Sequence, residues 1–127
     1  MNCRQKVLVV DDEVHILHVV SLKLRHAGFE VITAQDGLEA LELAQVELPD
    51  VIITDYQMPF LSGLELCHKL KQLPGTRAIP AIMLTARGFA LEEGAMAAAG
   101  IKVCMNKPFS PSEVLRVVEQ MVGITAA

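Results

Sequence analysis

Four sets of polar residues each follow an apolar run, so their side chains could share one reaction centre. They are Asp11-Asp12-Glu13, Asp55, Thr85 and Lys107. Parallel strands bring their carboxyl ends to one edge of a sheet, and open α/β sheets bind ligands at that edge. If the apolar runs are parallel strands, these residues form a single site although they are distant in sequence.

The chemistry of such a site follows from its charges. Three crowded carboxylates repel one another, which favours protonation of one of them or capture of a hard cation. Mg²⁺ takes oxygen ligands, keeps several waters and bridges carboxylates to phosphate oxygens. An aspartate can then attack phosphorus if positive charge neutralises the equatorial oxygens. Asp55 is the candidate nucleophile, and Lys107 and the Thr85 hydroxyl would each contact a phosphoryl oxygen.

The elements that would position these residues alternate between β-rich apolar runs and stretches with helical spacing. The runs cover residues 7–10, 31–34, 51–54, 81–84 and 101–105. They are apolar without alternation, as expected for strands that helices cover on both faces. The predicted fold class is α/β, with a five-stranded parallel sheet in a three-layer sandwich.

Apolar stripes predict one helix after each run. They lie at residues 14–24, 38–44, 64–70, 91–99 and 114–121. Gly28 stands where a left-handed cap would end the first helix near Ala27, and the alanine-rich fourth stretch is closed by Gly100. The last helix has a strong start signal in Ser110-Pro111-Ser112-Glu113, which supplies an N-cap serine, an early proline and a glutamate three residues later.

Composition limits the remaining classes of protein. The chain has 127 residues and a formal net charge of −4, which favours one domain (1–127, core about 6–122) and gives no reason to expect direct nucleic-acid binding. Its apolar runs are too short to span a membrane, and its N-terminus has no secretory pattern, so we expect a cytoplasmic protein. Three widely spaced cysteines indicate reduced, structural thiols.

Four motifs in order resemble a response-regulator receiver domain of the chemotaxis-regulator-like family. They are Asp11-Asp12, Asp55-Tyr56-Gln57-Met58-Pro59 with Gly63, Thr85-Ala86, and Lys107-Pro108-Phe109. Each motif alone is common, but four of them, each after its own strand, are highly specific. The resemblance implies the flavodoxin-like receiver fold with sheet order 2-1-3-4-5.

The resemblance also implies roles for individual residues. Asp12 would ligate Mg²⁺ directly and Asp11 through water, with Asp55 and the backbone carbonyl of Gln57 completing the protein ligands. Asp55 would be the phosphoacceptor, assisted by Thr85 and Lys107. A cis bond between Lys107 and Pro108 would aim the lysine.

A receiver would take its phosphoryl group from a histidine kinase or a histidine phosphotransfer protein. It would then change its binding to a downstream protein through the fourth helix and fifth strand. We expect no enzyme activity beyond self-catalysed phosphotransfer and slow autodephosphorylation, and no direct contact with nucleic acid or membrane. The sequence leaves open whether the chain acts alone or carries an output domain in a longer protein, and whether phosphorylation causes homodimerisation.

One position departs from the receiver pattern. Receivers commonly have Tyr or Phe three residues before the lysine, and here that residue is Cys104. A cysteine offers neither the bulk nor the hydroxyl of the aromatic switch residue. Our hypothesis is that output relies on backbone shifts around residues 87–90.

Three other functions fit the sequence less well than a receiver does. A phosphatase of the haloacid-dehalogenase type would need a second aspartate two residues after Asp55, where Gln57 stands. A flavodoxin-like electron carrier would need a Ser/Thr-rich phosphate loop, and here Asp11 and Asp12 would repel the flavin phosphate. Metal binding by His15 and His18 lacks an evident third ligand.

Overall fold

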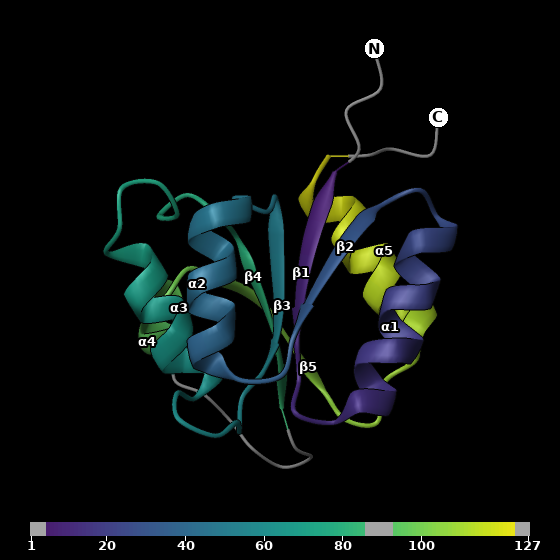
Figure 1. Cartoon of the computed structure of the whole chain (residues 1–127), viewed down its shortest axis with the longest axis horizontal. Helices are drawn as coiled ribbons and strands as arrows, with labels where there is room; N and C mark the ends of the chain where they lie inside the picture. Colours follow the sequence, from purple (N-terminus) through teal and green to yellow (C-terminus); the bar gives the residue numbers. More distant parts are fainter. Residues whose placement is uncertain (1–4, 86–92, 124–127) are drawn as a thin grey trace.

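The fold alternates strands and helices along the whole chain. The structure, a computed structural model, describes residues 5–85 and 93–123 (Figure 1). The strands are β1 (Lys6–Val10), β2 (Glu30–Ala34), β3 (Val51–Asp55), β4 (Ala81–Thr85) and β5 (Ile101–Asn106). The helices are α1 (Val14–His26), α2 (Gly37–Glu47), α3 (Gly63–Lys71), α4 (Glu93–Ala98) and α5 (Pro111–Met121).

The five strands form one parallel sheet in the order β2-β1-β3-β4-β5. The direction of winding changes between β1 and β3, which are neighbours in the sheet. The carboxyl ends of these two strands therefore flank the crevice where such sheets bind ligands. Both the α/β class and the expected strand order are confirmed.

Alternating residues of each strand are buried on opposite faces of the sheet. Val7 and Val9 of β1 pack on the side of α1 and α5, whereas Leu8 and Val10 pack on the side of α2 and α3. All four side chains are fully buried. A strand buried on both faces has no polar side to show, which explains the unbroken apolar runs.

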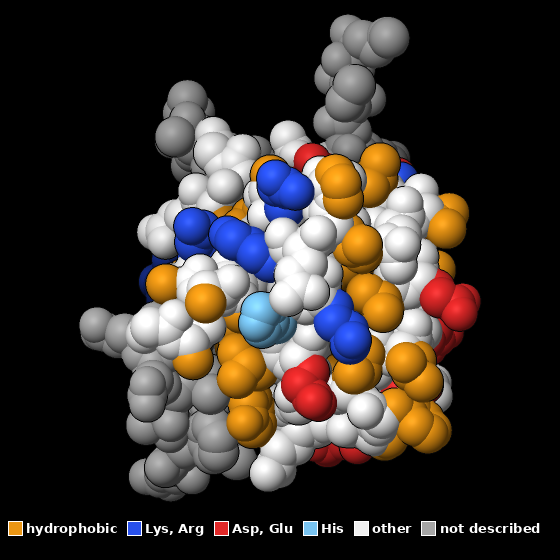
Figure 2. All heavy atoms as spheres, turned by 90° about the vertical axis from the view of Figure 1, so that its left-hand side faces the viewer, with side chains coloured by type: hydrophobic (Ala, Val, Ile, Leu, Met, Phe, Trp, Pro, Cys, Tyr) orange, Lys and Arg blue, Asp and Glu red, His pale blue; other side chains and the backbone are white. Residues whose placement is uncertain are grey.

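The helices form two layers on either side of the sheet, with α1 and α5 on one side and α2, α3 and α4 on the other (Figure 1). Figure 2 views the molecule from the side of the second layer, where apolar side chains are exposed between charged ones. Within residues 5–85 and 93–123, no helix has the length and hydropathy that crossing a membrane requires.

Local signals explain how several helices begin and end. Ser110 and Glu113 form the predicted capping box at the start of α5. Ser62 and Glu65 form a second one at the start of α3, which our sequence analysis did not predict. Gly28 has the predicted positive φ, 99°, directly after the C-cap residue of α1.

Some boundaries differ from those predicted. Asp55 and Thr85 are the last residues of their strands rather than the first residues after them. The sheet hydrogen bonds continue past both, because Tyr56 N–H donates to the Leu84 carbonyl and Lys107 N–H to the Thr85 carbonyl, each at 2.8 Å. The fourth helix covers Glu93–Ala98 and ends one residue before the predicted end at Ala99, whereas its predicted start at Leu91 falls in residues 86–92, outside the described part of the chain.

Candidate functional site

The polar residues predicted from the strand ends do meet at one edge of the sheet. Asp11 and Asp12 directly follow β1, and Asp55 ends β3 beside it. One carboxylate oxygen from each of these three aspartates lies within 4.8 Å of the other two. Asp11 and Asp55 are buried and Asp12 is exposed, so the cluster opens to solvent on one side.

Lys107 supplies the positive charge of the cluster. Its ammonium nitrogen, Nζ, lies 3.2 Å from Asp55 Oδ1, 3.5 Å from Asp11 Oδ2 and 3.6 Å from Glu13 Oε1. The lysine follows β5 directly, and the bond between Lys107 and Pro108 is cis, as the resemblance implied. Among the residues that the structure describes, one cation thus faces three carboxylates.

Asp11 is the most deeply buried of these carboxylates. Its Oδ1 accepts the Glu13 backbone N–H at 2.9 Å, but its Oδ2 is buried with no hydrogen bond from the described residues. Burial raises the pKa of Asp11 from 3.8 to about 6, and the Glu13 N–H and the Lys107 charge oppose that rise only in part. A buried oxygen without a hydrogen-bond donor can be satisfied by a proton or by a metal ion.

The pKa values of Asp55 and Lys107 are displaced in the same direction for different reasons. Burial raises the pKa of Asp55, and the nearby Lys107 charge partly offsets this effect. For Lys107 burial acts to lower the pKa, but Asp11 and Asp55 together outweigh it and hold the pKa above 10.5. The lysine is therefore firmly protonated at neutral pH.

The loop between β3 and α3, residues 56–62, is held by close backbone contacts. Gly63 N–H donates to the Tyr56 carbonyl at 2.8 Å, and a Cβ atom on Gly63 would collide with the Asp55 carbonyl oxygen. A Cβ atom on Gly37 would lie 2.5 Å from the Cβ atom of Leu61. Two glycines thus let the starts of α2 and α3 approach the segment that carries Asp55 and Gln57.

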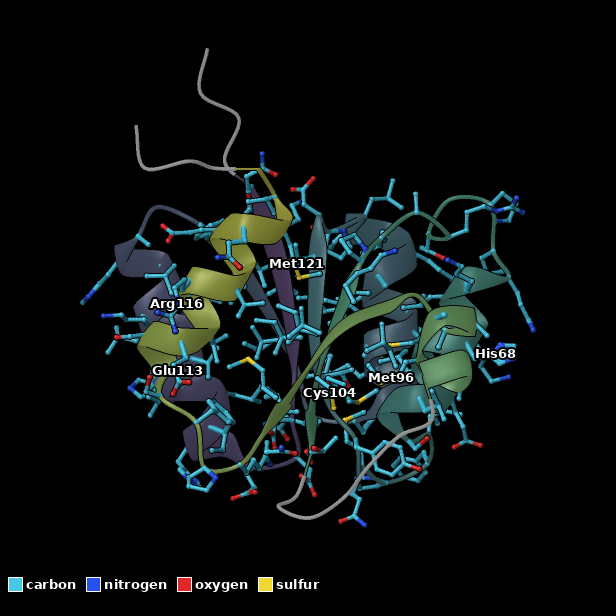
Figure 3. The ribbon with its side chains drawn as sticks, turned by 180° about the vertical axis from the view of Figure 1, so that it is seen from behind. His68, Met96, Cys104, Glu113, Arg116 and Met121 are labelled. Carbon is cyan, nitrogen blue, oxygen red and sulfur yellow. The ribbon has the colours of Figure 1, made fainter. Side chains whose placement is uncertain are left out.

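Thr85 lies at the end of β4 and is fully buried. Its hydroxyl donates to Asn106 Oδ1 at 2.9 Å and lies 3.9 Å from Cys104 Sγ. Asn106 is its register partner on the neighbouring strand β5. Figure 3 shows Cys104 on β5, between α4 and α5.

This donor set fits a small, hard cation. Three carboxylates lie close together, one buried oxygen lacks a hydrogen bond, and Asp12 faces solvent. Mg²⁺ prefers oxygen ligands and keeps part of its water shell, which an open site allows. Gln57 follows Asp55 by two residues, in the adjoining loop between β3 and α3.

Some groups that the sequence singled out do not belong to this cluster. His15 is exposed and pairs only loosely with Glu13, at 3.9 Å, and neither it nor His18 is in the group of potential metal ligands. Cys67 is a buried free thiol whose pKa burial raises to about 12. Ala86 of the Thr85-Ala86 motif and residues 87–90, where we expected the backbone shifts, lie outside the described residues.

Two residues of the site had no predicted role. Glu13 forms an ion pair with Lys107, and Asn106 Oδ1 accepts a hydrogen bond from the Thr85 hydroxyl. Glu13 was among the polar residues predicted to share the site, as the third acidic residue after the first strand, but its ion pair with Lys107 was not predicted. The pairing of Asn106 with Thr85 depends on the register between β4 and β5, which the sequence does not reveal.

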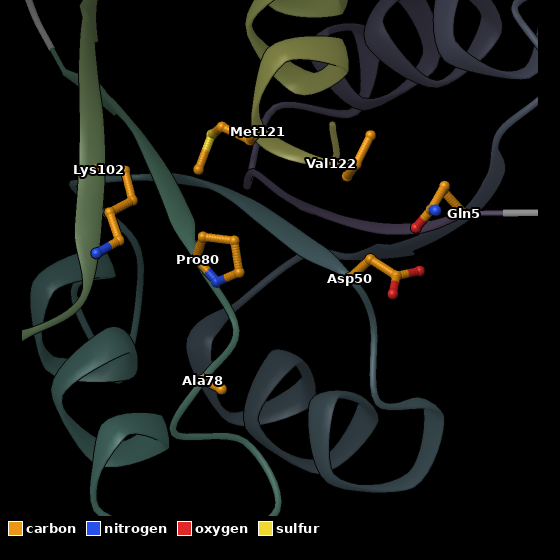
Figure 4. A pocket seen from close by; sticks show the side chains of 7 residues that line it. All are labelled: Gln5, Asp50, Ala78, Pro80, Lys102, Met121 and Val122. Atoms are coloured by element: carbon orange, nitrogen blue, oxygen red, sulfur yellow. The ribbon is translucent and has the colours of Figure 1, made fainter. Parts of the chain in front are cut away.

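A separate hollow lies at the opposite edge of the sheet. Its volume is about 530 Å³, and its walls include Gln5, Asp50, Pro80, Lys102 and Met121 (Figure 4). These residues stand at the amino ends of the strands and at the end of α5. The hollow is thus separate from the acidic cluster, which occupies the carboxyl ends.

Comparison with protein families gives a match over most of the chain. The family model "Response regulator receiver domain" matches residues 7–119. Among curated relatives, the alkaline phosphatase synthesis transcriptional regulatory protein PhoP of Bacillus subtilis is 42% identical over 110 residues, which are 87% of this chain and 45% of that protein. The phosphate regulon transcriptional regulatory protein PhoB of Rhizobium meliloti is 41% identical over 117 residues, 92% of this chain and 52% of that protein.

Two solved structures have the same fold over nearly their whole length. The chemotaxis response regulator CheY4 of Vibrio cholerae matches with a TM-score of 0.86 and 36% identity, over 94% of this chain and 99% of that one. The receiver domain of the sensor histidine kinase PA1611 of Pseudomonas aeruginosa matches with a TM-score of 0.84 and 27% identity, over 95% and 99%. That structure has a magnesium ion coordinated in its active site cleft. The chain spans about half the length of the curated relatives PhoP and PhoB.

Proposed function

This chain belongs to the response regulator receiver domains, the phosphoacceptors of two-component signalling, and from that premise we propose that its phosphoacceptor is Asp55. One observation carries the assignment: within the acidic cluster, Asp55 has the shortest ion pair with the Lys107 ammonium nitrogen, 3.2 Å against 3.5 Å for Asp11. Asp11 is fully buried and Asp12 is exposed, whereas Asp55 is enclosed but keeps 7% of its surface exposed at the mouth of the cluster.

We propose Mg²⁺ as the cofactor of this site. Asp12, Asp55 and the Gln57 backbone carbonyl would hold it directly, and Asp11 would hold it through water. The fit rests on the 4.8 Å cluster and on the buried Asp11 Oδ2 that lacks a hydrogen bond. When bound, Mg²⁺ neutralises charge on the transferred phosphoryl group.

The chain's own residues account for the transfer itself. A carboxylate oxygen of Asp55 attacks phosphorus, the new P–O bond forms, and the bond from phosphorus to the donor breaks with its electron pair leaving on the donor. Lys107 is protonated and already 3.2 Å from Asp55, so it can follow the negative charge onto a phosphoryl oxygen. The Thr85 hydroxyl, at the end of the next strand, would donate to a second oxygen.

The proposed donor is a phosphohistidine on a histidine kinase or histidine phosphotransfer protein in the cytoplasm. An apolar hollow of about 290 Å³ lies beside Lys107, between α1 and the start of α5. On the same surface, Val14, Val19 and Leu22 of α1 are 61%, 43% and 46% exposed. Apolar surface of this kind next to a reaction centre supports a protein donor that docks there.

The proposed output follows from the position of the site. Thr85 is the last residue of β4, and Lys107 directly follows β5. A change in the contacts of either side chain would therefore act first on β5, which Thr85 contacts through Asn106, and on the neighbouring helix α4. Met96 of α4 and Cys104 of β5 are partly buried and pack against the same buried cluster at the surface formed by α4 and β5 (Figure 3). We propose that phosphorylation alters the binding of a downstream protein, or of an output domain in a longer protein, at this surface.

Labelling by a small donor tests the phosphoacceptor. Wild-type protein incubated with acetyl phosphate and Mg²⁺ should gain one phosphoryl group per chain by intact-mass measurement, and lose it slowly without turning over further donor. Asp55→Asn should gain none. Asp36→Asn is a matched control because asparagine caps α2 about as well as the aspartate that now accepts Glu39 N–H. Labelling of Asp55→Asn at the wild-type level, or sustained hydrolysis of phosphoesters, would contradict the proposal.

A further inference from the structure

The Thr85 hydroxyl is already committed to a partner in the resting protein. It donates to Asn106 Oδ1 at 2.9 Å, across the register pair that ends β4 and β5. We propose that Asn106 is a positioning residue that competes with the phosphoryl group for the hydrogen bond that the Thr85 hydroxyl donates. This inference rests on the proposed role of Asp55 as phosphoacceptor. The Thr85–Asn106 hydrogen bond would thus hold the unphosphorylated state and break on phosphorylation.

The competition follows from the chemistry of a hydroxyl group. A threonine hydroxyl has one proton, so it can donate to one acceptor at a time. A phosphoryl oxygen carries negative charge and is a stronger acceptor than a neutral amide oxygen. Once Asp55 is phosphorylated, the Thr85 hydroxyl therefore keeps its proton but donates its hydrogen bond to the phosphoryl group instead of to Asn106.

The difference in burial makes this exchange possible at low cost. Thr85 is fully buried, so its hydroxyl needs a partner from the protein in the resting state. Asn106 is exposed, so its released amide can be hydrated. The buried partner gains a stronger acceptor while the exposed one returns to water.

Asn106 is better placed for this role than Cys104. Thr85 Oγ1 is 3.9 Å from Cys104 Sγ, and sulfur is a weak hydrogen-bonding group. The residue after Asn106 is Lys107, whose backbone N–H donates to the Thr85 carbonyl at 2.8 Å. A rearrangement of the Asn106 side chain would therefore alter the backbone at the end of β5, directly before Lys107.

A double-mutant cycle tests the competition, with beryllofluoride and Mg²⁺ as the probe, because beryllofluoride binds a carboxylate as a tetrahedral analogue of a phosphoryl group. Asn106→Ala should bind it about three- to tenfold more tightly than wild type, the range expected for loss of one competing hydrogen bond. Asn106→Asp, a stronger acceptor, should bind it more weakly. Lys102→Ala, at another exposed position of β5, is the control and should match wild type.

The Thr85 hydroxyl decides whether the effect has the proposed origin. In a Thr85→Ser background the Asn106→Ala effect should persist, and in a Thr85→Val background it should disappear. An equal effect in both backgrounds would overturn the inference while leaving Asp55 as phosphoacceptor. So would a crystal structure of the wild-type beryllofluoride complex in which Thr85 still donates to Asn106. Failure of the wild-type protein to bind beryllofluoride would instead overturn the proposed function, and this inference with it.

Discussion

The ammonium nitrogen of Lys107 lies 3.2 Å from Oδ1 of Asp55, and the same nitrogen is within 3.6 Å of Asp11 and Glu13. This cation is the largest influence that lowers the pKa of Asp55, and it adds to the Glu13 backbone N–H in lowering that of Asp11. Because it faces both the proposed metal ligands and the proposed phosphoacceptor, its removal should affect metal binding and phosphorylation in opposite directions.

Lys107→Met retains the length of the side chain and removes its charge. We expect Mg²⁺ to bind about tenfold more tightly at pH 8, because a repelling cation is lost. Labelling by acetyl phosphate should slow by about 100-fold, because a charge that stabilises the phosphoryl oxygens is lost. Calorimetric titration with Mg²⁺ and intact-mass kinetics measure the two effects. Weaker Mg²⁺ binding by this variant would show that the lysine holds the carboxylates in place rather than competing with the metal.

The buried Asp11 should make the metal-free protein less stable as pH rises. Its folded-state pKa is raised from 3.8 to about 6, so folding favours the protonated form. That stabilising contribution is complete below the unfolded pKa and is lost as pH rises through about 6. A rise of this size corresponds to about 3 kcal/mol in full, of which about 2 kcal/mol should be lost from the free energy of unfolding between pH 4 and pH 7.

Asp11→Asn tests this effect because the amide stays neutral at every pH. In the presence of a chelator its unfolding midpoint in urea should fall less over that range than the wild-type midpoint does, because only the raised pKa of Asp55 still contributes, and at pH 7 it should exceed the wild-type midpoint. Asp36→Asn is again the control and should keep the wild-type pH dependence. A lower stability of Asp11→Asn at pH 7 would mean that Asp11 is ionised and well compensated by Lys107.

Close packing of Gly63 against the Asp55 backbone should make this position intolerant of a side chain. In Gly63→Ala the new methyl group would meet the Asp55 carbonyl oxygen and lie 2.9 Å from Met83 Sδ. We expect a loss of about 1–3 kcal/mol in the free energy of unfolding and slower labelling of Asp55. Gly94→Ala is the matched control, since a Cβ atom there meets no atom of residues 5–85 and 93–123 within 4 Å and alanine favours the helix α4. Equal stability of the two variants would contradict the packing account.

The exposed apolar surface of α1 should matter for a protein donor and not for a small one. Leu22→Glu should lower the rate of transfer from a phosphorylated histidine kinase at least about tenfold, as expected for a charge placed in an apolar contact. It should leave labelling by acetyl phosphate unchanged. Leu38→Glu on α2 is the control, because Leu38 is similarly exposed, at 50%, on the other layer. Loss of both reactions in Leu22→Glu would indicate damage to the fold instead.

The sequence was sufficient to predict the fold because the residues of each strand are apolar on both faces. Val7 to Val10 could be recognised as a buried strand since no polar residue interrupts them, and the following carboxylates marked its carboxyl end. The strand order came from a family resemblance, since apolar patterning alone does not say which strands are neighbours. The start of α5 was predicted from a capping box, which is a purely local signal.

The rest of the site depends on relationships that are not local. Thr85 and Asn106 form a pair because of the register between β4 and β5, and a register cannot be deduced from either strand alone. The constraint on Gly63 likewise arises from its contact with the Asp55 backbone. Asp55 and Thr85 were placed just beyond their strands because polar residues usually end an apolar run, whereas the sheet hydrogen bonds extend past them.

We propose above that Asp55 accepts a phosphoryl group in a metal-dependent site shared with Asp11, Asp12, Thr85 and Lys107. Peptide mapping of wild-type protein after incubation with acetyl phosphate tests it most directly, with borohydride reduction to mark the acyl phosphate. We predict a single modified residue, Asp55, in the presence of Mg²⁺ and none after chelation. Modification of a different residue, or equal modification of Asp55 with and without Mg²⁺, would contradict this account.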